Sequence, residues 1–593
     1  MESNNNIPNN LYYQPPMLNN IHPKKPEITL SKRDVIFAFV FLALSFVIVD
    51  FVFFHGFNLG FTIAFGLLFS VLTLYLFNKD NKVSLFSYIC GALSLAGAVT
   101  LALYKDTLIN TIMVFLVCAL FSIYICGISG AFRHREGSWK ALVDTLKSVF
   151  VSPFSSASEI TGAYGRAMSK NKASKNVIIG IALSLPVLLV IIPLLISSDA
   201  AFENLIKLVM KNIGIYLVEI ALAAVITPYI IFYTVSKKHS KKDSSALKSN
   251  SGRGLIQGSV TVSFLSVISV TYIVYLFSQL AYFFSAFSGI LPAGYTRTAS
   301  EYARRGFFEM FAICVINMVI IAAANILTKR VRGKIPVSIK AFSTFILLFT
   351  VLILITAMQK MKLNIECFGL SKNRLLVSVF MLMIMLIILF YIVHIFLPKV
   401  SYMQPIIVIC SAMFIALSFA NIDNMVVRYN VNAYNEGRIS TIDVDYIKNM
   451  SDSSLEYAVE LADCDNHRVS KKIRTLIIQK IRDDYGQAFN LDDMDKYDHS
   501  IIYKPDSDFR SYNYSADKAC RFLEEYYNRL SSDERKKLIT QYQLDNGDYY
   551  YDEEKDIYEY YGSDSYSVYS YNEKTDMYEL SDSYSYEYEE IEQ

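Results

Sequence analysis

Residues 375–397 read LLVSVFMLMIMLIILFYIVHIFL, and this stretch decides the class of fold. It contains no Lys, Arg, Asp or Glu. An apolar helix of about 20 residues is long enough to cross the hydrocarbon core of a bilayer. Comparable runs recur from residue 35 to residue 421, and 53% of the 593 residues are hydrophobic whereas 19% are charged. A soluble protein of this length would interleave polar faces, so we expect a polytopic membrane protein.

Eleven such runs are expected to form membrane-spanning helices, which gives an all-α transmembrane domain over residues 35–421. The runs lie at 35–54, 57–77, 85–104, 108–128, 177–197, 214–235, 259–284, 307–327, 341–358, 375–397 and 404–421. Short loops rich in Lys and Arg stay on the cytoplasmic side. If the disordered, Asn- and Pro-rich tail of residues 1–34 is cytoplasmic, the three most basic connections are cytoplasmic too. The odd number of spans then puts the chain after residue 421 outside.

The chain changes character after the last expected span. From Ile422 onward it has 20 Lys and Arg against 38 Asp and Glu, whereas the preceding part has 36 against 16. Apolar residues recur at the spacing of one helix face at Ile473, Leu476, Ile477, Ile481 and Tyr485. We therefore expect a small extracytoplasmic helical domain over residues 422–543. In it, Cys464 and Cys520 either pair as a disulfide or remain free.

The last segment, residues 544–593, is acidic and rich in tyrosine. Its sequence YDEEKDIYE at 551–559 recurs as YNEKTDMYE at 571–579. Tyr-rich alternation on both sides of a polar turn favours a β-hairpin, so two hairpins would form a small sheet. The same low-complexity composition is also typical of a disordered tail, and the sequence leaves both open.

Polar residues inside the expected spans are candidates for function because each must find a partner or line a wet cavity. They include Asp50, Glu219 and Asn317, together with Glu309 at the start of its span. One interpretation is that they hold helices together through hydrogen bonds. The alternative is a cation or proton path through Glu219 and Glu309.

Residues 298–309, TASEYARRGFFE, predict a helix that enters the membrane with charged side chains. Thr298 and Glu301 have the spacing of a capping box. Glu301, Arg305 and Glu309 then follow at four-residue steps, so each side chain reaches the next. An unpaired Glu309 inside lipid would be costly, which makes this ladder a candidate site.

Basic residues also gather in the expected outer loops, against the usual trend. They are Arg297, Arg304, Arg305, Lys360, Lys362, Lys372 and Arg374. One hypothesis is an anion site for lipid head groups or anionic wall polymers. A second is that these cations dock the protein's own acidic domain, and a third is that they only extend to the membrane interface.

Motifs for catalysis or cofactor binding are missing from the sequence. The seven histidines have no metal-ligand spacing, and neither a G-x-S-x-G elbow nor a phosphate-binding loop occurs. We therefore expect no metal, no cofactor and no nucleic-acid partner, and the absence of a nucleophile argues against an enzyme.

Four stretches resemble one family of bacterial membrane proteins, domain of unknown function 4173. They are EYARRGFFE at 301–309, KLNIECFGLS at 362–371, NMVVRYNV at 424–431 and FRSYNYS at 509–515. The chain departs from that family's pattern at Cys367, Phe368 and Phe509. The resemblance implies fold and topology, but no activity. It also implies a functional polar cluster made of Glu301, Arg304, Arg305, Glu309, Glu366 and Asn430. We expect the protein to lie in a bacterial plasma membrane.

Three functions fit these observations. The first is an envelope scaffold or sensor, because some 170 residues after the last span are too many for a connecting loop. Its partners would be the bilayer and a protein or wall polymer outside. The second is an ion- or proton-coupled transporter that uses Glu219 and Glu309. The third is an enzyme on a lipid-linked substrate near Glu301, Arg304 and Arg305.

Overall fold

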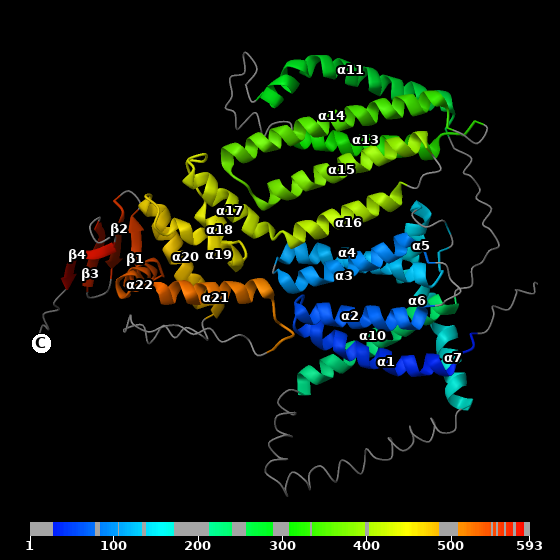
Figure 1. Cartoon of the computed structure of the whole chain (residues 1–593), viewed down its shortest axis with the longest axis horizontal. Helices are drawn as coiled ribbons and strands as arrows, with labels where there is room; N and C mark the ends of the chain where they lie inside the picture. Colours follow the sequence, from blue (N-terminus) through cyan, green and yellow to red (C-terminus); the bar gives the residue numbers. More distant parts are fainter. Residues whose placement is uncertain are drawn as a thin grey trace, which may run out of the picture.

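The computed structural model is mostly helical, with one small sheet near its C-terminal end (Figure 1). The residues that it describes are 28–77, 83–104, 106–132, 134, 138–170, 213–239, 256–288, 307–331, 335–397, 402–485, 508–546, 549–552, 555–561, 565–572 and 577–585.

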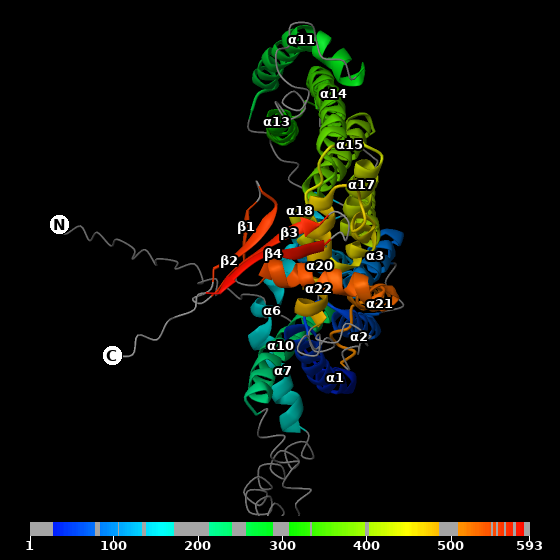
Figure 2. The same ribbon diagram turned by 90° about the vertical axis from the view of Figure 1, so that its left-hand side faces the viewer.

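The long apolar helices form two groups. The first group contains α1 (Lys32–Ile48), which continues as the π-helical turn η1 (Val49–Phe54), α2 (Leu59–Leu76), α3 (Leu85–Leu103), α4 (Thr107–Ile128), α10 (Ile213–His239) and α16 (Met403–Phe419). The second group contains α11 (Gly258–Ser288), α13 (Phe307–Leu327), α14 (Val337–Phe368) and α15 (Lys372–Phe396). Figure 2 shows the second group above the first, and α16 packs on α3 while also contacting α15.

The prediction of a polytopic membrane protein is confirmed. Within the described residues, nine helices are long and apolar enough to cross a membrane, or up to ten if α16 and α17 (Ile422–Asn435), bent by 61°, form one span. Every expected span coincides with one of these helices except 177–197, which lies outside the described residues.

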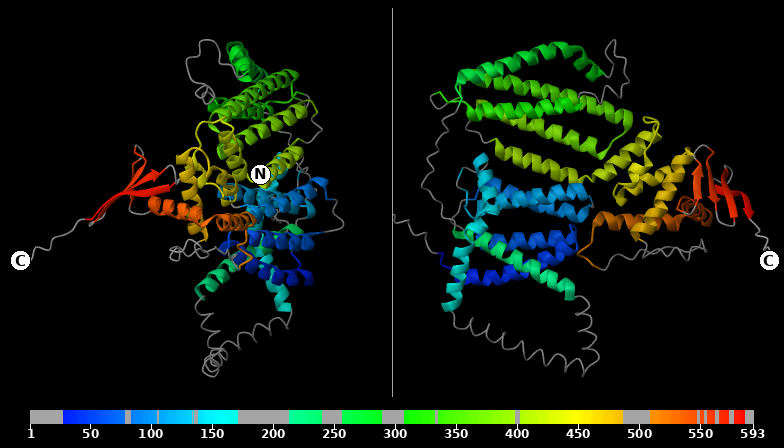
Figure 3. Two further views of the ribbon diagram at one scale, coloured as in Figure 1. Left: turned by 60° about the vertical axis from the view of Figure 1, so that its left-hand side comes forward. Right: turned by 180° about the vertical axis from the view of Figure 1, so that it is seen from behind.

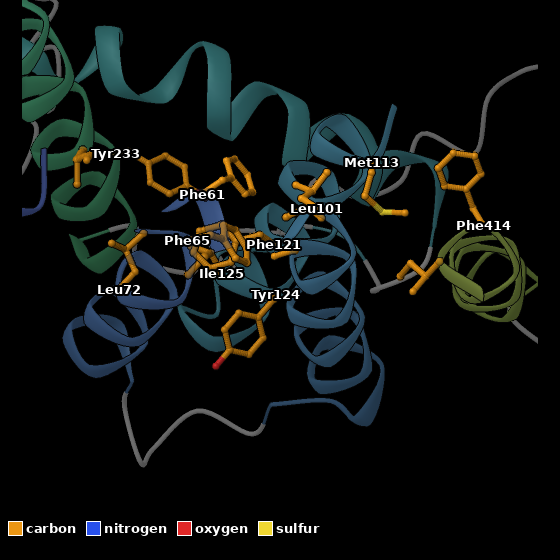
Figure 4. Packing of buried hydrophobic residues seen from close by; sticks show 14 of the residues in the cluster. Phe61, Phe65, Leu72, Leu101, Met113, Phe121, Tyr124, Ile125, Tyr233 and Phe414 are labelled. Atoms are coloured by element: carbon orange, nitrogen blue, oxygen red, sulfur yellow. The ribbon is translucent and has the colours of Figure 1, made fainter. Parts of the chain in front are cut away.

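The first group is held together by an aromatic core between α2 and α4 (Figure 4). The ring centres of Phe65 and Phe121 lie 5.2 Å apart, and those of Phe69 and Tyr124 lie 4.8 Å apart. Such pairs add to the packing of helices that gain no hydrophobic driving force from one another inside lipid. On α3, Gly91 leaves room for Tyr124, because a Cβ there would lie 2.8 Å from the tyrosine ring.

The second group has a buried polar contact between three helices. Asn317 on α13 is fully buried. It accepts a hydrogen bond of 2.5 Å from the Tyr272 hydroxyl on α11 and donates one of 2.9 Å to the Thr350 hydroxyl on α14. This arrangement agrees with the interpretation that polar residues in the spans hold helices together.

Three shorter helices lie at one end of the first group, beside the start of α1. They are α5 (Trp139–Phe150), α6 (Ser152–Ser155) and α7 (Ala157–Lys170). Leu146, Phe150 and Phe154 on them are exposed. An apolar face exposed at the end of a membrane bundle is typical of helices that lie in the membrane interface.

The C-terminal region, residues 422–585, projects from the other end of the helices (Figure 3). Its helices are α17, α18 (Val444–Lys448), η2 (Asp452–Ser454), α19 (Leu455–Ala458), η3 (Val459–Leu461), α20 (His467–Tyr485), α21 (Tyr514–Arg529) and α22 (Ser532–Asn546). The predicted apolar face of α20 is buried in its core at Ile473, Leu476 and Ile477. No disulfide joins Cys464 and Cys520.

The tyrosine-rich tail forms an antiparallel sheet in the order β1-β2-β3-β4, so of the two alternatives left open by the sequence the structure has the two hairpins. The strands are β1 (Tyr549–Asp552), β2 (Ile557–Tyr561), β3 (Ser565–Asn572) and β4 (Met577–Ser585). The two copies of the repeat supply the β1–β2 and β3–β4 turns, and β2 pairs with β3 to join the hairpins. Alternation turns Tyr551, Tyr558 and Tyr578 to the face that packs on the helices.

The contact at Asn317 predicts a measurable cost when it is removed. The substitution Asn317→Leu leaves the hydroxyls of Tyr272 and Thr350 without this partner inside lipid, so we expect a loss of about 1 kcal/mol in the free energy of unfolding. Thermal unfolding in detergent measures it. The matched control is Thr356→Val, because the buried Thr356 hydroxyl donates to the Leu352 carbonyl of its own helix. Equal losses in the two variants would contradict a role for Asn317 between helices.

Candidate functional site: the junction of the membrane helices and the C-terminal region

The junction is the set of helix ends and loops where the membrane helices meet the C-terminal region. The chain itself passes through it between α16 and α17. Asn421 has a left-handed backbone (φ 51°), and its side chain accepts a hydrogen bond from the backbone N–H of Asn424. Asn tolerates this conformation better than most residues. One residue therefore ends α16, caps α17 and sets the 61° bend between them.

The side chain of Asn430 on α17 forms two hydrogen bonds with the turn between α14 and α15. The Asn430 Oδ1 accepts a hydrogen bond of 2.7 Å from the backbone N–H of Leu370, and its Nδ2 donates one of 2.8 Å to the Leu370 carbonyl. Gly369 precedes this residue with φ 75° and ψ 176°, a conformation that is essentially restricted to glycine. A Cβ at Gly369 would also lie 2.6 Å from the Asn430 Oδ1. The second helix group is thereby fixed to the C-terminal region.

Next to this turn, one lysine joins three helix ends. The Lys372 ammonium at the start of α15 lies 2.8 Å from Asp106, which caps α4, and 2.7 Å from Asp423 on α17. Asp423 is buried, and its other oxygen accepts a hydrogen bond of 2.7 Å from the Ser451 N–H. Because two carboxylates share one cation, removing Lys372 would leave two like charges facing each other at low solvent exposure.

The first helix group is reached by a loop that precedes α21. The Arg510 guanidinium lies between Asp50 on η1, at 2.6 and 2.8 Å, and Asp508 on its own loop, at 2.6 Å. His55 Nε2 lies 3.0 Å from Asp508, and His55 Nδ1 lies 2.7 Å from the Asp50 carbonyl oxygen. A π-helical turn is often found at functional sites, and here η1 carries Asp50 to the loop.

Backbone contacts complete the attachment of this loop. The carbonyls of Arg510 and Tyr512 accept hydrogen bonds from the first N–H groups of α2, at Gly60 (3.0 Å) and Leu59 (3.1 Å). These N–H groups have no partner within the helix, so the loop acts as an external cap. Asn513 is buried and donates to the Leu101 carbonyl of α3 at 3.3 Å. The approach requires glycine at Gly60, where a Cβ would lie 2.9 Å from the Arg510 carbonyl oxygen.

The positive charge of Arg510 and the negative charges of Asp508 and Asp50 attract each other. Hydrogen bonds from the Arg510 guanidinium and backbone are the main reason that the pKa of Asp508 lies below its ordinary value. The same pairing, first with Asp508 and then with Asp50, raises the pKa of Arg510. Both charges are partly exposed, so solvent screening reduces the stability that they contribute. The junction as a whole binds protein to protein through ion pairs and backbone hydrogen bonds.

The structure brings some of the predicted site residues to the junction. Asp50 and Asn430 form the contacts described above, whereas Glu366, at the end of α14, is exposed and lies 3.7 Å from Lys362. Glu301, Arg304 and Arg305 lie outside the described residues, and of Glu309 only the helical backbone is described.

The remaining polar candidates lie away from the junction. Asn317 holds three helices of the second group together. Glu219 is half-buried on α10, which packs against α1, whereas Glu309 belongs to α13, which packs against α14. These two glutamates thus lie on different helix groups, and a path that uses both stays a prediction.

The basic residues of the expected outer loops are engaged by the protein itself where the structure describes them. Lys372 pairs with Asp106 and Asp423, and the Arg374 guanidinium donates to the carbonyls of Phe368 and Gly369. Of these contacts only the pair with Asp423 reaches the acidic C-terminal half, so the hypothesis that the cations dock that half stays a prediction. Arg297, Arg304 and Arg305 lie outside the described residues.

Sequence reasoning missed most of the pairings at the junction. Asp106, Asp423 and Asp508 were not among the candidates, Lys372 was named only as one of several basic residues, and Arg510 appeared only within a longer stretch. A usable signal was present, since three of the four quoted stretches, 362–371, 424–431 and 509–515, meet at the junction. That signal identifies the segments but not the residue that each side chain contacts.

A comparison with protein families decides the membership of the chain. The family model described as Domain of unknown function (DUF4153) matches residues 36–461. The chain belongs to this family. The resemblance to domain of unknown function 4173 is therefore wrong, because the matching model is that of a different family. The DUF4153 region contains Asp50, Lys372 and Asn430 but ends before Arg510. No curated protein and no solved structure matches the chain.

The contact of Asn430 with the α14–α15 turn leads to a testable prediction. Gly369→Ala combines an unfavourable backbone conformation with a clash against Asn430, so we expect a loss of about 2 to 4 kcal/mol. Gly437→Ala is the matched control, because Gly437 also has a positive φ (70°) but nothing lies within 4 Å of its added Cβ. We expect that variant to lose only about 1 kcal/mol. Thermal unfolding of both variants measures the difference, and equal losses would show that Asn430 does not hold the turn.

The charge pair at Asp508 predicts a pH dependence. Since Arg510 lowers the pKa of Asp508, the carboxylate stabilises the folded state above its ordinary pKa of 3.8. This contribution is lost as the pH falls from there towards the lowered pKa. We therefore expect Asp508→Asn to lower the melting temperature at neutral pH, and the gap to wild type to shrink below the ordinary pKa. Asp465→Asn, at an exposed residue of the same region, is the control. A gap that widens on acidification would contradict the assignment.

Proposed function

We propose that this integral membrane protein is a scaffold or sensor of the bacterial envelope that presents its C-terminal region outside the plasma membrane. The observation that carries the proposal is the junction, which attaches the C-terminal region to both helix groups. Arg510 and Asn513 reach the first group, while Asn430 and Asp423 reach the second. A region that served only as a trailing segment would need no contact with either.

The double attachment supports a role in coupling. The C-terminal region contacts η1, α2 and α3 on one side and the α14–α15 turn on the other, so a change in the packing of the two groups alters the geometry at its base. Likewise, a partner bound to the C-terminal region acts on both groups through the same contacts. Coupling of this kind needs differential contacts in two states, and the ion pairs of the junction are suited to it because they break and re-form without loss of the core.

The charge distribution supports the orientation in the proposal. The helix ends opposite the junction carry Arg33 at the start of α1 and Lys237 and Lys238 at the end of α10, and Lys238 pairs with Asp34. The C-terminal region belongs to the acidic half of the chain. Basic ends favour the cytoplasm, so the junction and the C-terminal region would lie outside.

Protease treatment of oriented membrane vesicles tests the proposal. We expect a peptide tag after Gln593 to be removed from right-side-out vesicles only, and a tag before Met1 from inside-out vesicles only. The double variant Arg510→Gln, Asn430→Ala should speed cleavage within residues 422–546 by about tenfold or more, because opening of the junction costs less free energy. Arg529→Gln removes an exposed pair with Glu525 instead and is the control.

Two results would contradict the proposal. Removal of the C-terminal tag from inside-out vesicles alone would reverse the orientation. Ion flux in proteoliposomes that is unchanged by deletion of residues 440–593 would favour the transporter, because a presenting protein depends on that region.

A further inference from the structure

A pocket of about 570 Å³ lies in the C-terminal region between α18, α20 and the sheet. Residues of α20 form one wall, the segment from Ile442 to Lys448 forms the opposite wall, and Tyr551 and Tyr558 of the sheet close one end. Its volume is in the range of small-molecule sites, roughly 300–1,000 Å³. The residues that line it make none of the junction contacts described above, although the wall from Ile442 to Lys448 adjoins the junction through the hydrogen bond of 2.8 Å from the Lys372 N–H to the Tyr446 hydroxyl.

The pocket wall contributed by α20 is basic. Arg468, Lys471 and Lys472 line it, and Lys448 adds a fourth cation from α18. Residues three and four positions apart lie on the same face of a helix, so α20 directs its three cations into one space. The basic lining stands out because residues 422–593 carry 38 acidic side chains against 20 basic ones.

Two carboxylates also line the pocket, and both have identified roles. Asp443 caps α18 by accepting a hydrogen bond of 2.9 Å from the Tyr446 N–H. Asp445 lies 3.4 Å from Lys472, and both side chains are well exposed. Four cations against two carboxylates leave the lining with an excess of positive charge.

Lys471 gives the pocket a fixed cation at its base. It is 7% exposed, its ammonium lies 3.3 Å from the centre of the Tyr551 ring and 4.3 Å from that of Tyr558, and it donates to the Tyr578 hydroxyl. Tyr578 in turn donates to Asp556 in the β1–β2 turn. Three aromatic faces around a desolvated ammonium hold it strongly. These contacts attach the sheet to α20 and fix the position of the wall that it forms.

We propose that this pocket binds a small anion, a sugar or polyol that carries a phosphate or carboxylate group. Arg468, Lys448 and Lys472 supply charge-assisted donors at the rim, where an arginine matches either anion with two parallel N–H groups. Thr475 and Gln479, further along α20, add a hydroxyl and an amide suited to ligand hydroxyls. A few polar groups placed within a rigid cavity are what specific recognition of such a ligand requires.

The position of the pocket distinguishes the source of the anion. The sheet lies at the end of the molecule remote from the membrane helices (Figure 1), whereas the α18 wall of the pocket contacts the start of α15, where the Lys372 N–H donates to the Tyr446 hydroxyl at 2.8 Å. Because the sheet end of the pocket faces away from the membrane helices, we expect the ligand to come from solution or from a polymer outside the membrane rather than from the bilayer head groups. This source depends on the proposed orientation, whereas binding itself depends only on the pocket.

Isothermal titration calorimetry of the full chain in nanodiscs of neutral lipid tests the proposal. The probes are glucose 6-phosphate, glucuronate and, as the uncharged comparison, glucose. We expect at least one anion to bind with a Kd of about 1 mM or tighter and glucose to bind at least about tenfold more weakly. The double variant Arg468→Gln, Lys448→Gln should weaken binding of the anion by about tenfold or more.

The control variant removes two cations of the same region outside the pocket. Arg438→Gln, Arg529→Gln takes away exposed partners of Glu436 and Glu525 and changes the net charge by the same amount. It should bind within about twofold of wild type, since distant exposed charges are screened. Glucose binding as tightly as both anions, or equal losses in the two variants, would overturn the proposal.

A lipid arm separates the two sources of anion. Vesicles that contain phosphatidylglycerol are added to the same nanodiscs, and we expect them to bind no more tightly than neutral vesicles. Binding to these vesicles without binding to either free anion would overturn the proposal in favour of a lipid surface. Since the test reads binding alone, its failure is distinct from a failure of the orientation that the protease experiment measures.

Discussion

The ion pair between Arg510 and Asp50 joins residues 460 positions apart and marks the contact on which the attachment of the C-terminal region to the first helix group depends. It connects a loop of the C-terminal region to the first helix of the membrane domain. Backbone hydrogen bonds to α2 and the contact of Asn513 with α3 can form only where this loop lies against the helix ends. The charge pair is partly exposed and weak by itself. The neighbouring hydrogen bonds to α2 and α3 restrict the positions that the loop can take.

The same principle applies at the second attachment. Helices inside lipid satisfy their own backbone groups, whereas the groups at their ends need partners from outside the helix. Here the C-terminal region supplies them, through Asn430 at the α14–α15 turn and through the loop at the start of α2. The two helix groups, which share α16 as their link, are thus both completed by residues that lie beyond the last span.

The sequence predicted those features that depend on local pattern. Apolar runs such as 375–397 located the spans, and the repeat at 551–559 and 571–579 located both hairpins, because length and alternation are local properties. The pairing of Lys372 with Asp106 and Asp423 and the enclosure of Lys471 by three tyrosines could not be predicted in this way. They depend on which segments of the chain lie next to each other in the folded protein. The local pattern of a single sequence does not show which distant segments these are. Asn430 stood out as a residue, but its partner Leu370 did not.

The separation of Asp50 from Arg510 also bears on how the protein is made. Ribosomes add about 5–20 residues per second, so roughly 20–90 s pass between the synthesis of the two residues. During this time α1 is already available for insertion, and the carboxylate of Asp50 is without its arginine. The membrane domain is therefore assembled in an unfinished form, and translation of the distal loop is the event that completes it.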